Sequence, residues 1–150
     1  MREILIEKLQ EYIRTNNPDI LISLQEEGKV SGFLSDKLAA INDLLEKLIM
    51  EEQPAYIIEE LCMKVMTADL RPSKYNYIEA ILAEEFQIIH QQLERSGTLM
   101  YEVINLIAFC QPVFETIGFT EDNEEDNQLR NAIIGSIQMY FENNQCDKKQ

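Results

Sequence analysis

One histidine is the first residue to consider for chemistry. His90 is the only histidine in the chain, so metal sites built on two histidines are excluded, including the ferritin type with its two Glu-x-x-His pairs. A Ser-His or Cys-His catalytic pair would have to use His90 itself, and no nucleophile motif points to it. Glu94 follows at i,i+4, where two side chains share a helix face. We interpret His90 as a structural histidine beside a carboxylate.

The three cysteines indicate neither a disulfide framework nor a zinc site. Cys62, Cys110 and Cys146 are odd in number, and no Cys-x-x-Cys occurs. Cys62 and Cys110 lie in apolar runs, which predicts that they are small core residues. This cysteine pattern favours a cytoplasmic location. No apolar stretch approaches the roughly 18 residues of a membrane helix, so we expect no membrane association.

The segment from Glu121 to Asp126 is acidic at every position except Asn123. Counted from Asp122, carboxylates fall at positions 1, 3 and 5 of an EF-hand loop, but the glycine of position 6 and the glutamate of position 12 are missing. We therefore expect no calcium and no other metal or cofactor.

Two roles compete for these acids. Two or three of them would satisfy the dipole of the helix that follows, and no lysine or arginine lies between Arg95 and Arg130 to relieve the rest. A solvated, solubilising loop is one interpretation. The other is that the loop contacts a basic partner, and the residues predicted to do so are Glu121, Asp122, Glu124 and Glu125.

The overall charge limits the classes of partner. The net charge is −14, from 27 acids against 13 bases, and such a chain repels the phosphates on which nucleic-acid affinity is built. Between Lys74 and Arg130 the only lysine or arginine is Arg95, against eleven acids. The paired glutamates are sequence neighbours, which point away from each other on a helix and do not form acid–base dyads. No phosphate-binding or nucleophile-elbow motif occurs, so we do not expect an enzyme.

The elements that carry these residues are predicted to be helices throughout. Helix-favouring residues dominate, and five glycines and four prolines are too few for the turns of many short strands. A length of 150 residues suits one domain. We predict an all-α fold, a multi-helix orthogonal array or bundle of about six to eight helices with no sheet. Its domain is expected to cover residues 1–142, followed by a polar tail over 143–150. The expected helices are 3–16, 17–28, 31–52, 54–68, 73–95, 98–110, 112–117 and 127–142.

Local signals place several of the ends. Asn17 is expected to cap the second helix, Gly28 to end it in the left-handed conformation, and Ser73 to cap the fifth. A narrow stripe at steps of four and three predicts a core face within 31–52, with a coiled-coil seam as the alternative. Its residues are Leu34, Leu38, Ile41, Leu45 and Leu48.

The middle of the chain also carries a recognisable pattern. It runs from Asn17-Pro18-Asp19 through Ile58-Glu59-Glu60-Leu61-Cys62-Met63-Lys64-Val65-Met66 and Asp69-Leu70-Arg71-Pro72-Ser73-Lys74-Tyr75 to Ile81-Leu82-Ala83-Glu84-Glu85-Phe86. On these residues the chain resembles a family of small all-helical domains of unknown function found mainly in Bacteroidetes. It departs from the family at Pro72, where an aromatic residue is usual, and in the long helix, which lacks an Arg-Ala signature. The resemblance implies an all-helical fold and brings no catalytic residues.

Together these observations predict a non-enzymatic, acidic, helical protein-interaction or regulatory module. Its partner is expected to be a protein, either one with a basic surface or a second copy in a homodimer. The alternative is an acidic antagonist, a nucleic-acid mimic or an inhibitor or immunity-type protein that covers a basic surface. A small enzyme is a third reading, for which a deep polar pocket would be the sign.

Overall fold

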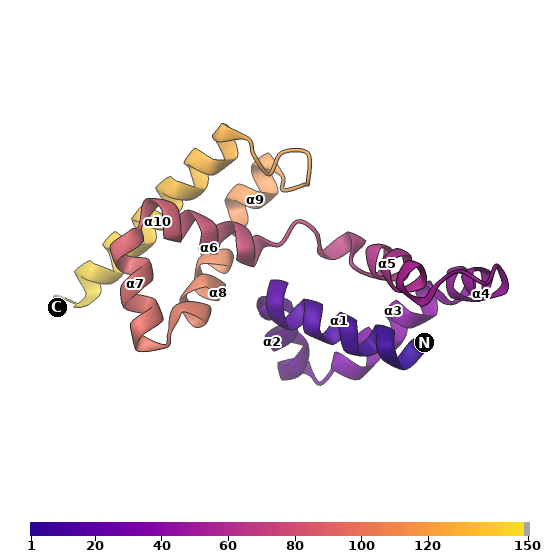
Figure 1. Cartoon of the computed structure of the whole chain (residues 1–150). Helices are drawn as coiled ribbons and strands as arrows, with labels where there is room; N and C mark the ends of the chain where they lie inside the picture. The colour runs from indigo at the N-terminus through magenta and orange to yellow at the C-terminus, as the bar shows by residue number, and fades with distance from the viewer. Residues whose placement is uncertain (149–150) are drawn as a thin grey trace. The chain divides into compact units, whose positions relative to one another are not determined.

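The fold was determined as a computed structural model, which describes the backbone of residues 1–148 and the side chains of residues 1–144 (Figure 1). The prediction of an all-α fold is confirmed, since the described residues contain no strand. The predicted number of six to eight helices is too low, because ten α-helices are present in the described part of the chain. They are α1 (Arg2–Asn16), α2 (Pro18–Glu27), α3 (Val30–Ala40), α4 (Asn42–Met50), α5 (Ala55–Met66), α6 (Lys74–Glu85), α7 (Gln87–Ser96), α8 (Leu99–Phe109), α9 (Gln111–Ile117) and α10 (Asn127–Lys148), with a short 3₁₀ helix, η1 (Ala68–Leu70), after α5.

The two additional helices result from two helix breaks that the sequence analysis did not predict. The helix expected over 31–52 is interrupted at Ile41, and the one expected over 73–95 is interrupted at Phe86. Neither position is a glycine or a proline. At the other end, α10 continues past the expected end at Glu142 to Lys148, so a helix covers most of the predicted tail.

The chain folds into two compact units, one over Met1–Arg71 and one from Pro72 onward. Each unit has its own hydrophobic core, and the two cores share no residue. A single domain over residues 1–142 stays a prediction. None of the described helices combines the length and the apolar character needed to cross a bilayer.

The first unit is built around α1, which contacts α2, α3 and α5. Its apolar face buries Leu5, Leu9 and Ile13. The predicted stripe forms the opposing wall, since Ile41 and Leu45 are fully buried, Leu34 and Leu48 are nearly so, and Leu38 is half-buried. The stripe is therefore core, as predicted. The break at Ile41 separates α3, which contacts α1 and α5, from α4, which contacts α5.

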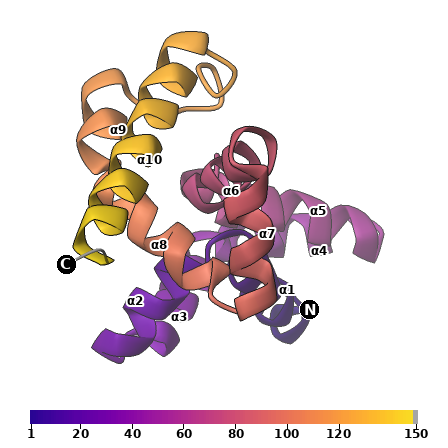
Figure 2. The same ribbon diagram turned by 90° about the vertical axis from the view of Figure 1, so that its left-hand side faces the viewer.

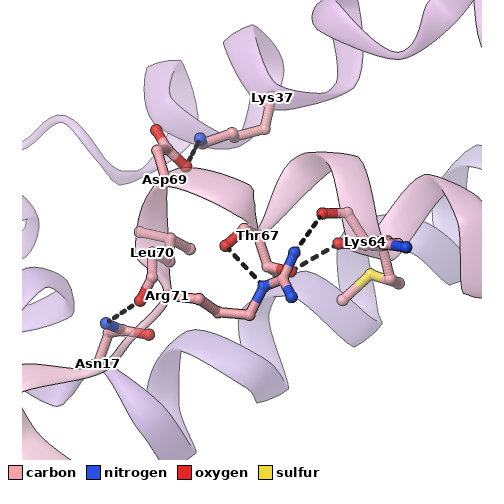
Figure 3. Close-up of polar contacts among 8 residues, drawn as sticks. Asn17, Lys37, Lys64, Thr67, Asp69, Leu70 and Arg71 are labelled. Atoms are coloured by element: carbon pink, nitrogen blue, oxygen red, sulfur yellow. Dashed lines mark hydrogen bonds and ion pairs between the residues drawn. The ribbon is translucent and has the colours of Figure 1, made fainter. Parts of the chain in front are cut away.

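Polar contacts close the end of the first unit (Figure 3). The Arg71 guanidinium donates to the backbone carbonyls of Lys64 at 3.0 Å and Thr67 at 3.4 Å, both at the C-terminal end of α5. Asn17 was expected to cap α2, but its side chain makes no capping bond. It donates instead to the carbonyl of Leu70 at 3.3 Å, so this buried amide fastens the α1–α2 junction to η1.

The second unit is built around α6, which contacts α7, α8 and α10. Ser73 caps α6 as predicted, accepting a hydrogen bond from the backbone N–H of Asn76 at 3.1 Å. Its core contains an aromatic cluster of Tyr77, Phe114 and Phe119. The ring centroids of Tyr77 and Phe114 are 6.3 Å apart, and each lies 5.0 Å from the ring centroid of Phe119.

The two units repeat one plan at an offset of 69 residues. The junctions at Asn17 and Phe86 share φ,ψ values of −136°, 52° and −132°, 52°. Gly28 and Gly97 end the next helices in the left-handed region, at φ 68° and 74°. The breaks at Ile41 and Cys110 follow at the same spacing. The helix contacts match as well, because α1 to α5 touch one another in the same pairs as α6 to α10.

The buried residues of the two cores occupy corresponding positions. Along the first helices Leu9 corresponds to Ile78 and Ile13 to Leu82, and further on Leu34 corresponds to Val103. The units differ most in the connection to their last helix. Residues 51–54 join α4 to α5 in the first unit, whereas the longer segment 118–126 joins α9 to α10 in the second. Beyond this difference the buried positions are offset by 71 residues, and they pair Ile58, Cys62 and Met66 with Leu129, Ile133 and Ile137.

Candidate functional site

The acidic loop 118–126 joins α9 to α10 at the end that these two helices share (Figure 2). Its one neutral residue within the acidic run holds it in shape. The Asn123 side chain accepts a hydrogen bond from the backbone N–H of Thr120 at 2.7 Å and donates to the carbonyl of Gly118 at 2.7 Å. Gly118 has φ 89°, a conformation that favours glycine. A neutral side chain and backbone groups thus help to hold the shape of the loop.

One acid of the loop has a structural task. The Asp126 carboxylate accepts a hydrogen bond from the backbone N–H of Gln128 at 3.0 Å, which caps the N-terminus of α10. The four acids predicted to contact a partner are all exposed: Glu121, Asp122, Glu124 and Glu125.

Two of these four acids, Glu124 and Glu125, lie at the edge of a cavity of about 500 Å³ between α6, the loop and α10. Glu121 and Asp122 do not line it. The full lining consists of Asn76, Tyr77, Ala80, Ile81, Glu84, Glu124, Glu125 and Arg130. The structure therefore brings half of the predicted contact residues together with a third carboxylate, Glu84, from a distant part of the sequence.

Arg130 is the single basic group of this cavity, and it is already paired. Its Nη2 atom lies 2.7 Å from Glu84 Oε2 and 3.1 Å from Glu85 Oε1. The hydrogen bond to Glu85, with further support from Glu84, raises the pKa of the Arg130 guanidinium. Two carboxylates neutralise its charge, so the cavity as a whole remains negative.

Tyr77 is one of the residues that line the cavity. It is 8% exposed, and its hydroxyl has no hydrogen-bond partner among the described residues. Burial raises the pKa of this phenol; Arg130 lowers it, while Asp126 and Glu124 raise it. The hydroxyl itself is buried, and the ring packs against Phe114 and Phe119.

The first unit has an ion pair at the corresponding place. Lys8 stands 69 positions before Tyr77, and Glu59 stands 71 positions before Arg130. Lys8 Nζ lies 2.9 Å from Glu59 Oε2. The first unit thus has a partly exposed ion pair at these two positions. The second unit has Tyr77 and Arg130 at the corresponding positions, and Arg130 pairs with Glu84 and Glu85 of α6.

The other candidates from the sequence have structural surroundings. His90 and Glu94 share a helix face as expected, with Nδ1 3.7 Å from Glu94 Oε1 and Nε2 3.9 Å from Glu79 Oε1. Cys62 and Cys110 are buried core residues, as predicted. Burial raises the pKa of the Cys110 thiol to about 11 and also raises that of Cys62. Within the described residues, no group of three or more histidine, cysteine or acidic side chains is placed to hold a metal ion.

Sequence reasoning missed Tyr77, Glu84 and Arg130. A signal for Arg130 was present, because it is the first basic residue after the longest stretch without one. Nothing in the sequence marks Tyr77, whose burial depends on the return of the loop onto α6. The arrangement as a whole offers carboxylates around a partly apolar hollow, which suits the binding of a cationic group.

Comparison with known proteins gives a family match over most of the chain. The family described as "Domain of unknown function (DUF1896)" matches residues 6–146. No similar protein was found among the curated proteins or among the solved structures.

Proposed function

The chain belongs to the DUF1896 family of domains of unknown function, and we propose that it is a non-enzymatic protein-interaction module. In this proposal, the acidic face of the second unit binds a basic surface of a partner protein. A cytoplasmic location and an origin in the Bacteroidetes are part of the same proposal. They are supported by the isolated cysteines and by the residues that carry the resemblance.

The concentration of carboxylates around one hollow carries the proposal. Glu124 and Glu125 line it from the loop, and Glu84 lines it from α6. Arg130 donates a hydrogen bond to Glu84 and another to Glu85. The loop holds its shape through hydrogen bonds of Asn123 and Asp126. A fixed cluster of like charges steers a partner of opposite charge and speeds association at low salt.

The same face argues against self-association through it. In a two-fold symmetric dimer each patch meets a copy of itself or of its neighbours, and this patch would bring carboxylates together. A homodimer, if formed, would use another surface. The acidic antagonist remains the second candidate, supported by the one-sided charge between Lys74 and Arg130. It differs in its target, which would be the nucleic-acid-binding surface of a protein.

The test uses synthetic helical peptides that carry four lysines on one face, with glutamine-substituted peptides as neutral probes. The variant Glu121→Gln, Asp122→Asn, Glu124→Gln, Glu125→Gln removes four charges and spares the cap at Asp126. A matched control removes four exposed acids of the first unit: Glu7→Gln, Glu26→Gln, Asp36→Asn and Glu60→Gln.

The loop variant should keep its melting temperature and lose most of the association rate at low salt, where charges interact over a long range. The control should lose little. Equal losses in both variants would mean that only net charge matters, and the proposal would fail. Competition between the peptides and a protein that binds double-stranded DNA would favour the antagonist.

A further inference from the structure

The second unit carries an uncharged face on α8, the start of α9, and α10. The two longest stretches of the sequence without Asp, Glu, Lys or Arg are 103–114 and 131–141. The first lies on α8 and α9 and the second on α10, which contacts both of these helices (Figure 2). We propose that this α8–α10 face is the surface through which two copies of the chain associate as a homodimer. The proposal goes beyond the binding of a basic partner and uses other residues.

The exposed residues of the two stretches are all neutral. They are Asn105, Ala108, Phe109 and Pro112 in the first stretch and Asn131, Gly135, Gln138 and Met139 in the second. Phe109 is 39% exposed and Met139 is 57% exposed. The ring centroid of Phe109 lies 5.4 Å from that of Tyr140, which follows Met139 in α10, so this contact joins the two stretches. Aromatic residues and methionine without charges are typical of the centre of a protein–protein interface.

The first unit shows that the fold accepts charges at these positions. The repeat offsets of 69 and 71 residues place the eight exposed positions at Asp36, Ala39, Ala40, Asp43, Glu60, Lys64, Thr67 and Ala68. Four of these eight residues are charged, and all four charged side chains are exposed. The helices make the same pairs of contacts in both units. Packing within the second unit therefore does not explain why all eight of its residues are neutral.

The charge of the chain favours a second copy as the occupant of this face. The net charge is −14, so two copies repel each other over most approaches. In a two-fold symmetric dimer each patch meets a copy of itself or of its neighbours, and like charges brought together there oppose association. A neutral face avoids this cost. A basic partner, in contrast, gains no attraction from a neutral face and is drawn to the acidic loop.

The polar residues of the face are self-complementary. Asn131 and Gln138 are exposed amides on α10, and an amide side chain has both donors and an acceptor. The same amide on two copies can therefore pair with itself across a two-fold axis. A carboxylate, which only accepts, and an ammonium group, which only donates, cannot do so. The chemistry of the face thus matches that of a second copy.

Gly135 leaves room for close approach in the middle of α10. It is exposed, and a Cβ atom at this position would meet nothing within 4 Å. Packing inside the unit therefore does not require a glycine, although glycine in a helix interior is less favourable than alanine. The missing side chain allows the backbone of another molecule to come close.

The experiment measures the mass of the full chain by analytical ultracentrifugation from low to high micromolar concentration. We expect a reversible dimer that becomes tighter as salt is added, because salt screens the repulsion between two acidic copies. Gly135→Gln adds a neutral side chain in open space and should weaken the dimer at least about 10-fold by steric overlap. Gly32→Gln is the matched control, because Gly32 is an exposed glycine of α3 with equally open space. It should leave the dimer unchanged.

A second variant keeps the test decisive if Gly135→Gln does not fold. Met139→Glu brings two like charges into the interface and should weaken the dimer at least about 10-fold. Ala68→Glu adds the same charge at the equivalent exposed position of the first unit and should have little effect. Circular dichroism checks the fold of each variant. A monomeric wild type, a dimer that survives both changes in α10, or equal losses in variants and controls would overturn the assignment of this face.

The dimer and the proposed function fail separately. Gly135→Gln should associate with the basic peptides at the wild-type rate, and the four-charge loop variant should still dimerise. If the wild type stays monomeric while the loop acids still speed peptide association, the dimer is wrong and the proposed function stands. If the loop variant keeps the wild-type rate with the peptides while Gly135→Gln loses the dimer, the proposed function is wrong and the dimer stands.

Discussion

The Asn123 side-chain amide donates to the backbone carbonyl of Gly118 at 2.7 Å, across the width of the acidic loop. The same side chain accepts from the backbone N–H of Thr120 at 2.7 Å. One neutral residue thereby sets the conformation in which five neighbouring carboxylates are presented.

Asn123→Ala should release this loop. We expect the free energy of unfolding to fall by about 1–2 kcal/mol, because two hydrogen bonds are lost, and amide exchange over residues 118–126 to speed up. Asp122→Asn, at the exposed neighbouring position, is the control and should leave exchange unchanged. Equal protection in Asn123→Ala and wild type would show that the loop is held by other contacts.

Ile41→Asp tests the core of the first unit. Ile41 is 0% exposed at the break between α3 and α4, so the carboxylate would be buried without a partner. The loss in unfolding free energy should be at least about 3 kcal/mol, a large part of a domain's total. Ile49→Asp on α4, where the side chain is 49% exposed, should change stability little. Chemical denaturation measures both, and similar values for the two would contradict the assignment of the core.

Ser73→Ala tests the cap of α6. The lost hydrogen bond to the Asn76 N–H should lower the free energy of unfolding by about 1 kcal/mol. Ser35→Ala, on the exposed face of α3, serves as the control with no expected loss. A smaller effect at Ser73 than at Ser35 would mean that α6 begins without this cap.

The Cys110 thiol should make stability depend on pH in the alkaline range. Burial raises its pKa from 9.0 to about 11, so the thiol ionises more easily in the unfolded chain. Its contribution is fully present below pH 9 and is lost as the pH rises from about 9 to 11. The change amounts to about 2–3 kcal/mol.

The comparison of wild type with Cys110→Ala isolates this effect, since both share every other titrating group. The variant should be less stable at pH 8, because it leaves a small cavity, and the difference should shrink towards pH 11. A difference that stays constant over this range would contradict the burial-raised pKa.

The sequence predicted those features whose causes are local. Gly28 and Gly97 end helices because their left-handed conformation favours glycine, and Ser73 caps because its side chain reaches a nearby amide. The stripe through Ile41 was predicted as core from its spacing alone. The breaks at Ile41 and Phe86 could not be predicted, because both residue types are compatible with a helix. In the structure the two helices that flank each break contact a common neighbour, α5 for α3 and α4, and α8 for α6 and α7.

The repeat of the helix arrangement in the two units could not be predicted from the sequence for a related reason. Corresponding core positions keep their apolar character but change identity, as Leu9 with Ile78 and Leu34 with Val103 show. An offset of 69 residues also exceeds the repeat lengths of about 20–50 residues that mark solenoids. The cavity was hidden because Tyr77 and Glu84 become neighbours of the loop only through tertiary contacts.

Two copies of one packing plan in a single chain create a hazard during folding, since α1 and α6 offer similar apolar faces to similar acceptors. Chains with like halves are prone to such misassembly by exchange of equivalent elements. The different charges at these positions, Lys8 with Glu59 in one unit and Tyr77 with Arg130 in the other, oppose the exchange. Docking of α1 in the second unit would set Lys8 beside Arg130, two cations in a place that needs opposite charges or none, and docking of α6 in the first unit would leave Glu59 without its ammonium. The residues at these positions thus favour the docking of each first helix in its own half of the chain.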